Sequence, residues 1–132
     1  MLHHLSLGVA DIEGATAFYD AVLAPLGYVR VWSDLRPGEV NQAVGYGVPS
    51  GGDALALKHR PAGQRPPGPG FHVAFAAPDR QAVDQFHRAA LQHGGRDNGA
   101  PGLRAHYGPH YYAAFVIDLD GHHIEAVFNA AI

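Results

Sequence analysis

The feature that most constrains the fold of this chain is a weak internal repeat. A shift of 68 residues places His4 on His72 without any gap. The same shift also aligns Asp11 with Asp79, Phe18 with Phe86, Leu23 with Leu91, and Gly27 with Gly95. A repeat of this kind indicates two copies of one supersecondary unit, which pair to bury a core that neither copy could bury alone. The two equivalent histidines are then candidates for one site between the units.

The pattern in each copy predicts a short strand that begins with histidine, an aspartate N-cap, an amphipathic helix and a glycine that ends the helix. Three strands follow the first helix, and we expect them at residues 28–32, 42–48 and 54–59. The segment RPAGQRPPGPG holds four prolines and three glycines, which no regular element tolerates. These signals divide the chain into a first unit over residues 1–60, a linker over 61–70 and a second unit over 71–132.

The second unit repeats this order with a less regular pattern. Aromatic and β-branched residues predict strands at 111–117 and 122–128, on either side of an Asp-Leu-Asp-Gly turn. One strand is poorly marked, because the segment after the second helix is rich in glycine, asparagine and proline. We expect that strand near residues 103–107.

Strand alternation indicates which way the two histidines point. In both opening strands the bulky apolar residues form the face that the helix must cover, so His4 and His72 lie on the opposite face. In the last strand, HHIEAVF, Glu125 also points away from the apolar side. A carboxylate in the middle of an apolar strand is costly to bury unless it is paired or bound to a cation. Two imidazoles and one carboxylate are a known metal-ligand set that leaves coordination positions open for substrate.

The segments HLSLGVAD, FHVAF and DLDGHHIEAVF resemble the ligand strands of the vicinal oxygen chelate superfamily. That group includes glyoxalase I, fosfomycin-resistance enzymes, extradiol dioxygenases and bleomycin-resistance proteins. The resemblance covers nearly the whole chain, and DxDGHxxE is its most specific part. It implies an α+β fold of two βαβββ modules, whose curved mixed sheets form an open cleft. It also implies that His4, His72 and Glu125 hold one divalent metal ion, and this donor set suits Fe, Mn, Ni or Zn.

The fourth ligand position of the family, a glutamate in glyoxalase I, carries no carboxylate here. The repeat maps Glu125 onto Leu57, between Ala56 and Lys58. A glyoxalase I reaction is therefore less expected than a metal-dependent lyase, thiol transferase or dioxygenase acting on a small oxygenated molecule. The alternative is a non-catalytic protein that binds a drug or metabolite in the same cleft.

A second group of candidates lies in the segment His106-Tyr107-Gly108-Pro109-His110-Tyr111-Tyr112, which is richer in rings than a plain loop needs. The candidate catalytic residues are Glu125, His106, His110, Tyr111 and Tyr112. Tyr107 and Arg104 are candidates for substrate binding, through stacking and through an anionic group. An aromatic strand end buried under the linker explains the cluster equally well, and a solvated loop charge explains Arg104.

Composition narrows the classes of partner. The net charge of -3 and the lack of a basic run argue against nucleic acid and anionic membranes. The absence of cysteine excludes disulfides and thiolate metal sites. No stretch approaches a membrane span or a signal segment, so we expect a cytoplasmic protein. We also expect a homodimer, because open curved sheets leave strand edges and apolar faces that proteins normally cover. Whether the site forms within one chain or across two stays open.

Overall fold

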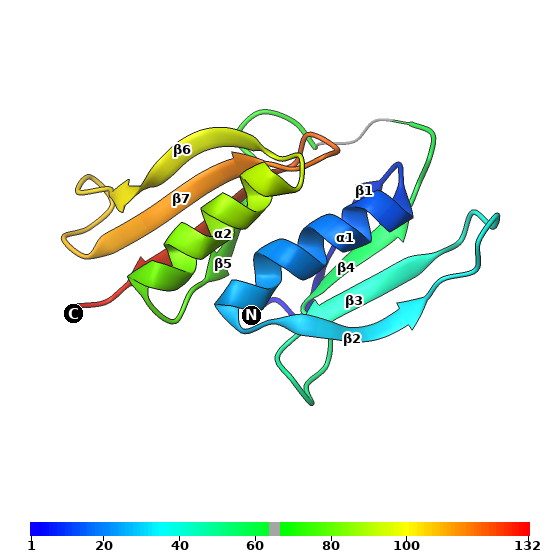
Figure 1. The fold of residues 1–132 in the computed structure, drawn as a ribbon, viewed down its shortest axis with the longest axis horizontal. Helices are drawn as coiled ribbons and strands as arrows, with labels where there is room; N and C mark the ends of the chain where they lie inside the picture. The colour runs from blue at the N-terminus through cyan, green and yellow to red at the C-terminus, as the bar shows by residue number, and fades with distance from the viewer. Residues whose placement is uncertain (64–66) are drawn as a thin grey trace.

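The computed structural model describes residues 1–63 and 67–132, and it contains two four-stranded mixed sheets with one helix packed on each (Figure 1). The α+β fold of two similar βαβββ modules with open sheets is confirmed. The predicted linker includes residues 64–66, which lie outside the described residues. No helix within the described ranges is long and apolar enough to cross a membrane.

The first module is built from strand β1 (Leu5–Val9), helix α1 (Ile12–Leu23), the 3₁₀ turn η1 (Ala24–Leu26) and strands β2 (Val29–Asp34), β3 (Ala43–Gly47) and β4 (Leu55–His59). Helix α1 begins where the Asp11 carboxylate accepts a hydrogen bond from the Gly14 N–H at 3.2 Å. The helical segment ends at Gly27, whose φ of 91° lets its N–H donate back to the carbonyl of Ala24.

The second module is built from strand β5 (Val73–Ala76), helix α2 (Arg80–Gln92) and strands β6 (Arg96–Leu103), β7 (Tyr111–Ile117) and β8 (His123–Asn129). Its helix begins in the same way, because the Asp79 carboxylate accepts from the Ala82 N–H at 2.8 Å. The strand order is β1-β4-β3-β2 in the first sheet and β5-β8-β7-β6 in the second, so the repeat in the sequence is a repeat in topology. In both sheets the first and last strands of the module pair in parallel.

The expected position of one strand was wrong. Strand β6 covers Arg96–Leu103, whereas the segment that follows it forms turns. The strand contains Gly99 and Pro101, and its register with β7 shifts twice. These residues are tolerated because β6 is the outer strand of its sheet, where a missing N–H costs no ladder bond and bulges absorb the irregularity.

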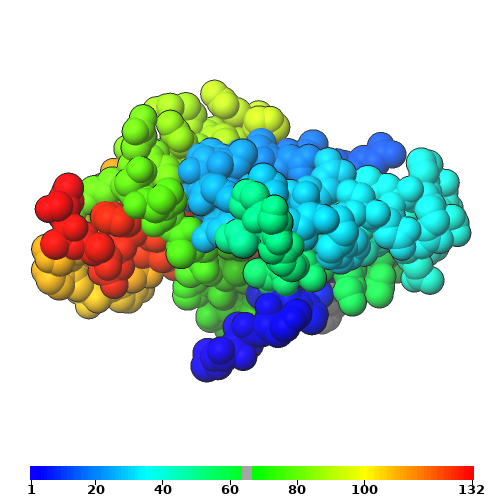
Figure 2. All heavy atoms as spheres, turned by 90° about the horizontal axis from the view of Figure 1, so that it is seen from below, coloured from blue at the N-terminus to red at the C-terminus, as the bar shows by residue number. Residues whose placement is uncertain are grey.

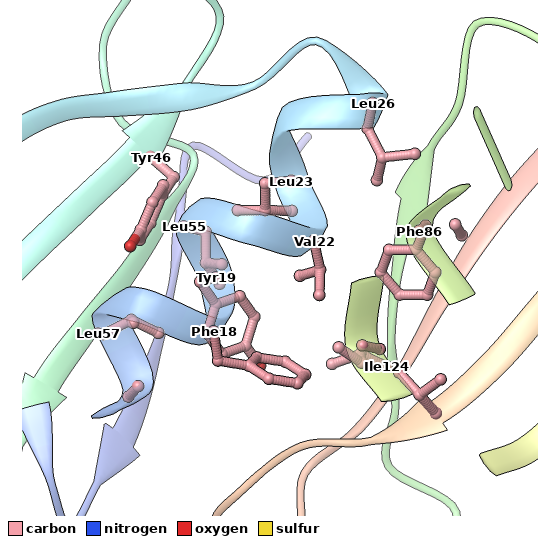
Figure 3. Close-up of a cluster of buried hydrophobic side chains, with 14 of the residues drawn as sticks. Phe18, Tyr19, Val22, Leu23, Leu26, Tyr46, Leu55, Leu57, Phe86 and Ile124 are labelled. Atoms are coloured by element: carbon pink, nitrogen blue, oxygen red, sulfur yellow. The ribbon is translucent and has the colours of Figure 1, made fainter. Parts of the chain in front are cut away.

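One continuous hydrophobic core joins the two modules. Helices α1 and α2 lie side by side and cover the same side of the two sheets (Figure 1), and side chains from both helices meet at their contact. Figure 3 shows Phe18 and Val22 on α1 directed toward Phe86 on α2 and Ile124 on β8. Phe18 and Phe86, which the repeat aligns, are 1% and 0% exposed. Each module therefore completes the core of the other.

Several polar contacts between the modules come from the turn at residues 118–122, which we call the DLDGH turn. Three hydrogen bonds connect it to the first module: Tyr19 Oη to Asp118 Oδ2 at 2.6 Å, Ala10 N to Asp120 Oδ1 at 2.8 Å, and His122 Nε2 to the Gly8 carbonyl at 2.8 Å. Because the carbonyl can only accept, His122 carries a proton on Nε2. The most specific part of the family resemblance thus also joins the two modules.

Candidate functional site

The face of each sheet that is turned away from its helix, here called the open face, carries most of the candidate site residues. In the second module, Ala74 pairs with Glu125, and Glu125 pairs with Phe115. Residues directly opposite one another in neighbouring strands share a face, and successive residues along a strand alternate. Tyr111 therefore lies on the open face with Phe115 and Glu125, whereas Tyr112 lies on the face toward α2.

Glu125 is the centre of the site. The residue is only 1% exposed, although its side chain lies on the open face of the second sheet. His72 Nε2 lies 3.0 Å from Glu125 Oε1, and the Tyr111 hydroxyl donates a short hydrogen bond to Glu125 Oε2. Both carboxylate oxygens are thus occupied by partners, as a buried carboxylate requires. An imidazole, a carboxylate and a phenol in direct contact can hold a cation or pass a proton.

The phenol of Tyr111 is a proton donor at neutral pH. Burial, followed by the hydrogen bond to Glu125 and the negative charge there, raises the pKa of Tyr111 from 10.0 to about 12. The ionised phenolate would lie against a carboxylate, which is unfavourable. Tyr111 therefore keeps its proton on Oη and directs it toward Glu125.

His72, Tyr111 and Glu125 line a pocket of about 310 Å³. Its wall also includes Asn98, Phe115, Tyr107 and His123. Sequence reasoning did not single out Asn98 or Phe115 as site residues. The signal for Phe115 was present, because it is four residues from Tyr111 along one strand and so shares its face. Asn98 had no comparable signal, because the strand that carries it was misplaced.

His4 lies elsewhere in the chain. It lines a different pocket, of about 280 Å³, between β1 and β5, and its Nδ1 is 2.9 Å from Nδ1 of His3. Figure 2 shows the first residues of the chain (dark blue) projecting from the body of the molecule. Within residues 1–63 and 67–132, no three His, Asp or Glu side chains are grouped closely enough to hold a metal ion. A single chain brings together two of the three expected ligands, His72 and Glu125.

The register of the strands corrects the expected fourth ligand position. Strand β4 pairs Ala56 with Ser6, just as β8 pairs Glu125 with Ala74. The counterpart of Glu125 is therefore Ala56 and not Leu57, because the second module has one more residue than the first between its first and last strands. Leu57 is 0% exposed and belongs to the core. The fourth position still lacks a carboxylate.

Tyr112 and Arg104 take part in other contacts. The Tyr112 hydroxyl donates to Asp84 on α2 at 2.6 Å, and Arg80 stacks over its ring at 5.0 Å. Arg104 donates to the carbonyls of Gly102 and Ala100 at 3.0 and 2.7 Å. Its guanidinium lies 5.3 Å from the centre of the Phe115 ring, so it supports a wall of the Glu125 pocket.

The loop before β7 forms a row of aromatic rings. The rings of His106 and Tyr107 are 4.1 Å apart, and those of Tyr107 and Tyr111 are 5.1 Å apart. His106 and His110 are both exposed to solvent. Tyr107 lines the pocket itself. The row therefore extends from solvent to the phenol that contacts Glu125.

The fold and the site identify the class of protein: paired βαβββ modules with a contact between an exposed histidine and a buried glutamate on an open sheet face. The family model for the Glyoxalase/Bleomycin resistance protein/Dioxygenase superfamily matches residues 1–126. The chain belongs to this superfamily. No curated protein matches the chain.

Several solved structures share the fold. A glyoxalase/bleomycin resistance protein from Albidiferax ferrireducens is 31% identical, with 94% of this chain and 95% of that chain covered and a TM-score of 0.75. A glyoxalase-related enzyme from Fulvimarina pelagi is 22% identical, covers 98% and 88%, and has a TM-score of 0.70. Glyoxalase I from Zea mays is 20% identical over 96% of this chain and 45% of that chain, with a TM-score of 0.73. The last two comparisons bear on the fold alone.

Proposed function

We propose that this chain is a cytoplasmic, homodimeric metalloenzyme acting on a small oxygenated molecule. The observation that carries the proposal is the contact of buried Glu125 with His72 in a pocket that also holds Tyr111. The two donor atoms are 3.0 Å apart, a separation that ligands of one metal ion can adopt once the proton between them leaves. His4 is the proposed third ligand, and it comes from a second copy of the chain.

The proposed second copy explains two further features. Strands β1 and β5 are the outer strands of their sheets, and each leaves one edge unpaired within its own sheet. The apolar pocket between them is lined by Leu5, Leu23 and Phe75, with His4 at its wall. In the proposed dimer, the partner chain covers these edges and places its own Glu125 pocket next to this His4. Modules 1–60 and 71–132, joined by linker 61–70, are the units that we propose to pair across the dimer.

The reaction class follows from the donor set. One divalent ion, Fe, Mn, Ni or Zn, would supply Lewis-acid chemistry at an oxygen of the bound molecule. Tyr111 donates its hydroxyl proton to Glu125 at the wall of the pocket, and the ring of Tyr107 would stack on the ligand. His106 and His110 are the exposed proton-transfer candidates, and Tyr112 and Arg104 act by positioning their neighbours. Because Ala56 supplies no second carboxylate, we favour a lyase, a thiol transferase or a dioxygenase over the glyoxalase I reaction.

One observation favours a second function, a non-catalytic binding protein. Both carboxylate oxygens of Glu125 are satisfied by protein partners, His72 and Tyr111. A pocket that is stable in this way can bind a drug or metabolite through its polar floor and aromatic wall. Metal content separates the two proposals.

The test measures bound metal in protein purified without a histidine tag. The wild type should hold one ion per chain, and His4→Ala, His72→Ala and Glu125→Gln should each lose it, whereas His93→Ala on the exposed end of α2 should not. Mixing the His4→Ala and His72→Ala chains should restore about a quarter of the wild-type content, because half the dimers are mixed and each has one intact site. Equal metal in all variants contradicts the triad. A loss with no recovery on mixing contradicts the shared site.

A further inference from the structure

One residue in the wall of the Glu125 pocket, Asn98, is followed directly by a glycine. The pair lies on β6, the outer strand of the second sheet (Figure 1). The residues on either side, Asp97 and Gly99, pair with two consecutive residues of β7, so Asn98 is an extra residue without a partner in the ladder. Such a bulge leaves the extra residue outside the regular hydrogen bonding of the sheet. The neighbouring strand therefore does not hold Asn98 in place.

The side-chain amide of Asn98 is also unrestrained. Within residues 1–63 and 67–132 the amide makes no hydrogen bond to another group. The residue is exposed, so water reaches its carbonyl carbon. An amide that is free in this way can turn toward the main-chain nitrogen of the next residue, Gly99.

The fold requires glycine at position 99. Its φ of 148° is one that other residues rarely adopt, and a Cβ atom there would stand 3.0 Å from Phe115 Cδ2. A glycine has no side chain to shield its main-chain nitrogen. The residue that the sheet needs after Asn98 is therefore also the one that least hinders attack by that nitrogen on the Asn98 amide.

Asp97 restrains this nitrogen. The Gly99 N–H donates to Asp97 Oδ1 at 3.0 Å, and the same oxygen lies 2.9 Å from His87 Nε2 on α2. The nitrogen must lose its hydrogen to attack a carbonyl carbon. A hydrogen bond to the neutral amide and a nearby negative charge both oppose this loss. The attack therefore requires that the bond to Asp97 opens first.

We propose that Asn98 is a site of spontaneous deamidation, which places a carboxylate in the wall of the Glu125 pocket. The Gly99 nitrogen forms a bond to Asn98 Cγ, and the bond from Cγ to the side-chain nitrogen breaks. The leaving nitrogen takes up the proton of the Gly99 amide and departs as ammonia. Water then opens the cyclic succinimide at either carbonyl, which gives aspartate or isoaspartate. Both products carry a negative charge, and no Lys or Arg among the described residues lines this pocket to neutralise it.

The test follows purified, folded wild-type protein over several weeks at mildly alkaline pH by peptide mass spectrometry. The chain supplies its own controls, because Asn41 and Asn129 are also exposed but precede glutamine and alanine. Asn98 should gain about one dalton and yield isoaspartate, because an NH₂ group is replaced by a hydroxyl. Asn41 and Asn129 should stay unchanged over the same period. No change at Asn98, or equal rates at the three asparagines, overturns the proposal.

A variant tests the restraint. Asp97→Ala should speed the deamidation of Asn98 about tenfold, the effect of removing one hydrogen bond to a charged acceptor. Asp34→Ala is the matched control, because it removes an exposed carboxylate from β2, the outer strand of the other sheet, where it is paired with Arg36 at 2.9 Å. An unchanged or slower rate in Asp97→Ala overturns the restraint. If Asp97→Ala fails to fold, the comparison of the three asparagines in the wild type still decides on the site.

The effect on the pocket is measured with Mn²⁺ alone, and only this step rests on the proposed function. Asn98→Asp should bind Mn²⁺ about tenfold more tightly than the wild type, because the added negative charge attracts the cation. Asn129→Asp adds the same charge outside the pocket and should have little effect. Equal affinities of the three proteins contradict the effect on the pocket. Deamidation of a protein that binds no metal refutes the metal site alone, and metal binding without deamidation refutes the modification alone.

Discussion

The hydroxyl of Tyr19 in the first module donates a 2.6 Å hydrogen bond to the carboxylate of Asp118 in the second. Both residues are almost fully buried, at 1% and 5% exposed. The bond joins positions 99 residues apart, at the point where the DLDGH turn meets the first module. The effect of removing this bond on the free energy of unfolding therefore measures how much the contact between the modules stabilises the fold.

Removing this hydroxyl should destabilise the fold. Tyr19→Phe leaves a buried carboxylate oxygen without its donor, at a cost of about 1–3 kcal/mol in the free energy of unfolding. Tyr28→Phe is the matched control, because it removes a hydroxyl that also bridges the modules, donating to the Ala76 carbonyl at 2.7 Å, but at a more exposed site. Its cost should be about 1 kcal/mol or less. Urea denaturation of both variants measures the difference, and equal costs would contradict the role assigned to Asp118.

The contribution of Asp118 to stability should fall as pH rises through the acidic range. Burial raises the pKa of Asp118 above its ordinary value, although the Tyr19 hydrogen bond opposes this. The folded state then binds the proton more tightly than the unfolded chain, so Asp118 contributes stability below its unfolded pKa of about 4 and loses it as pH rises through the folded-state pKa. Asp118→Asn should remove this component. The difference in unfolding free energy between wild type and variant, followed from pH 3 to 7, checks the sign.

Tyr111 should be the tyrosine whose titration depends on Glu125. In the difference between the ultraviolet titrations of the wild type and Tyr111→Phe, one phenol should ionise near pH 12. Glu125→Gln should lower this pKa, because it removes a negative charge from beside the phenol. The pKa should stay above 10, since burial is the largest cause of the shift. A titration unaffected by Glu125→Gln would show that the contact is absent in solution.

Two leucines that the repeat aligns should respond differently to truncation. Leu23 is 1% exposed and Leu91 is 43% exposed. Leu23→Ala should cost about 2–5 kcal/mol, because it leaves a cavity in the core. Leu91→Ala should cost about 0.5 kcal/mol or less, as for most surface changes. Thermal and urea unfolding of the two variants give the comparison, and similar costs would mean that the modules pack differently from the arrangement described.

A new carboxylate tests the corrected register. Leu57→Glu places a charge in the core and should prevent folding or cost several kcal/mol. Ala56→Glu places the charge on the open face, as at Glu125, and should be tolerated better. Far-ultraviolet circular dichroism and urea unfolding separate the two. Under the proposed metal site, Ala56→Glu should also increase metal affinity, which titration of metal-free protein measures.

The sequence by itself determined the local elements and their repetition. The aspartate caps, the glycine stops and the alternation of apolar residues depend on neighbours within a few positions, so they are readable along the chain. The same alternation indicated correctly that Glu125 faces away from the helix. It also contained the information that Tyr111 and Tyr112 lie on opposite faces of β7.

Only the tertiary structure decided how these elements combine. The sequence did not indicate strand β6, because its glycines and proline are typical of a loop. They are tolerated in a strand at the edge of a sheet, and that position is set by the neighbouring strands. The equivalence of Glu125 with Ala56 depends on pairing between strands, where a shift of one residue reverses the face of every side chain. The separation of His4 from Glu125 likewise depends on contacts between segments distant in sequence. Local sequence patterns carry no information on contacts between distant segments. These contacts form only when the strands of each sheet pair and the two modules pack together.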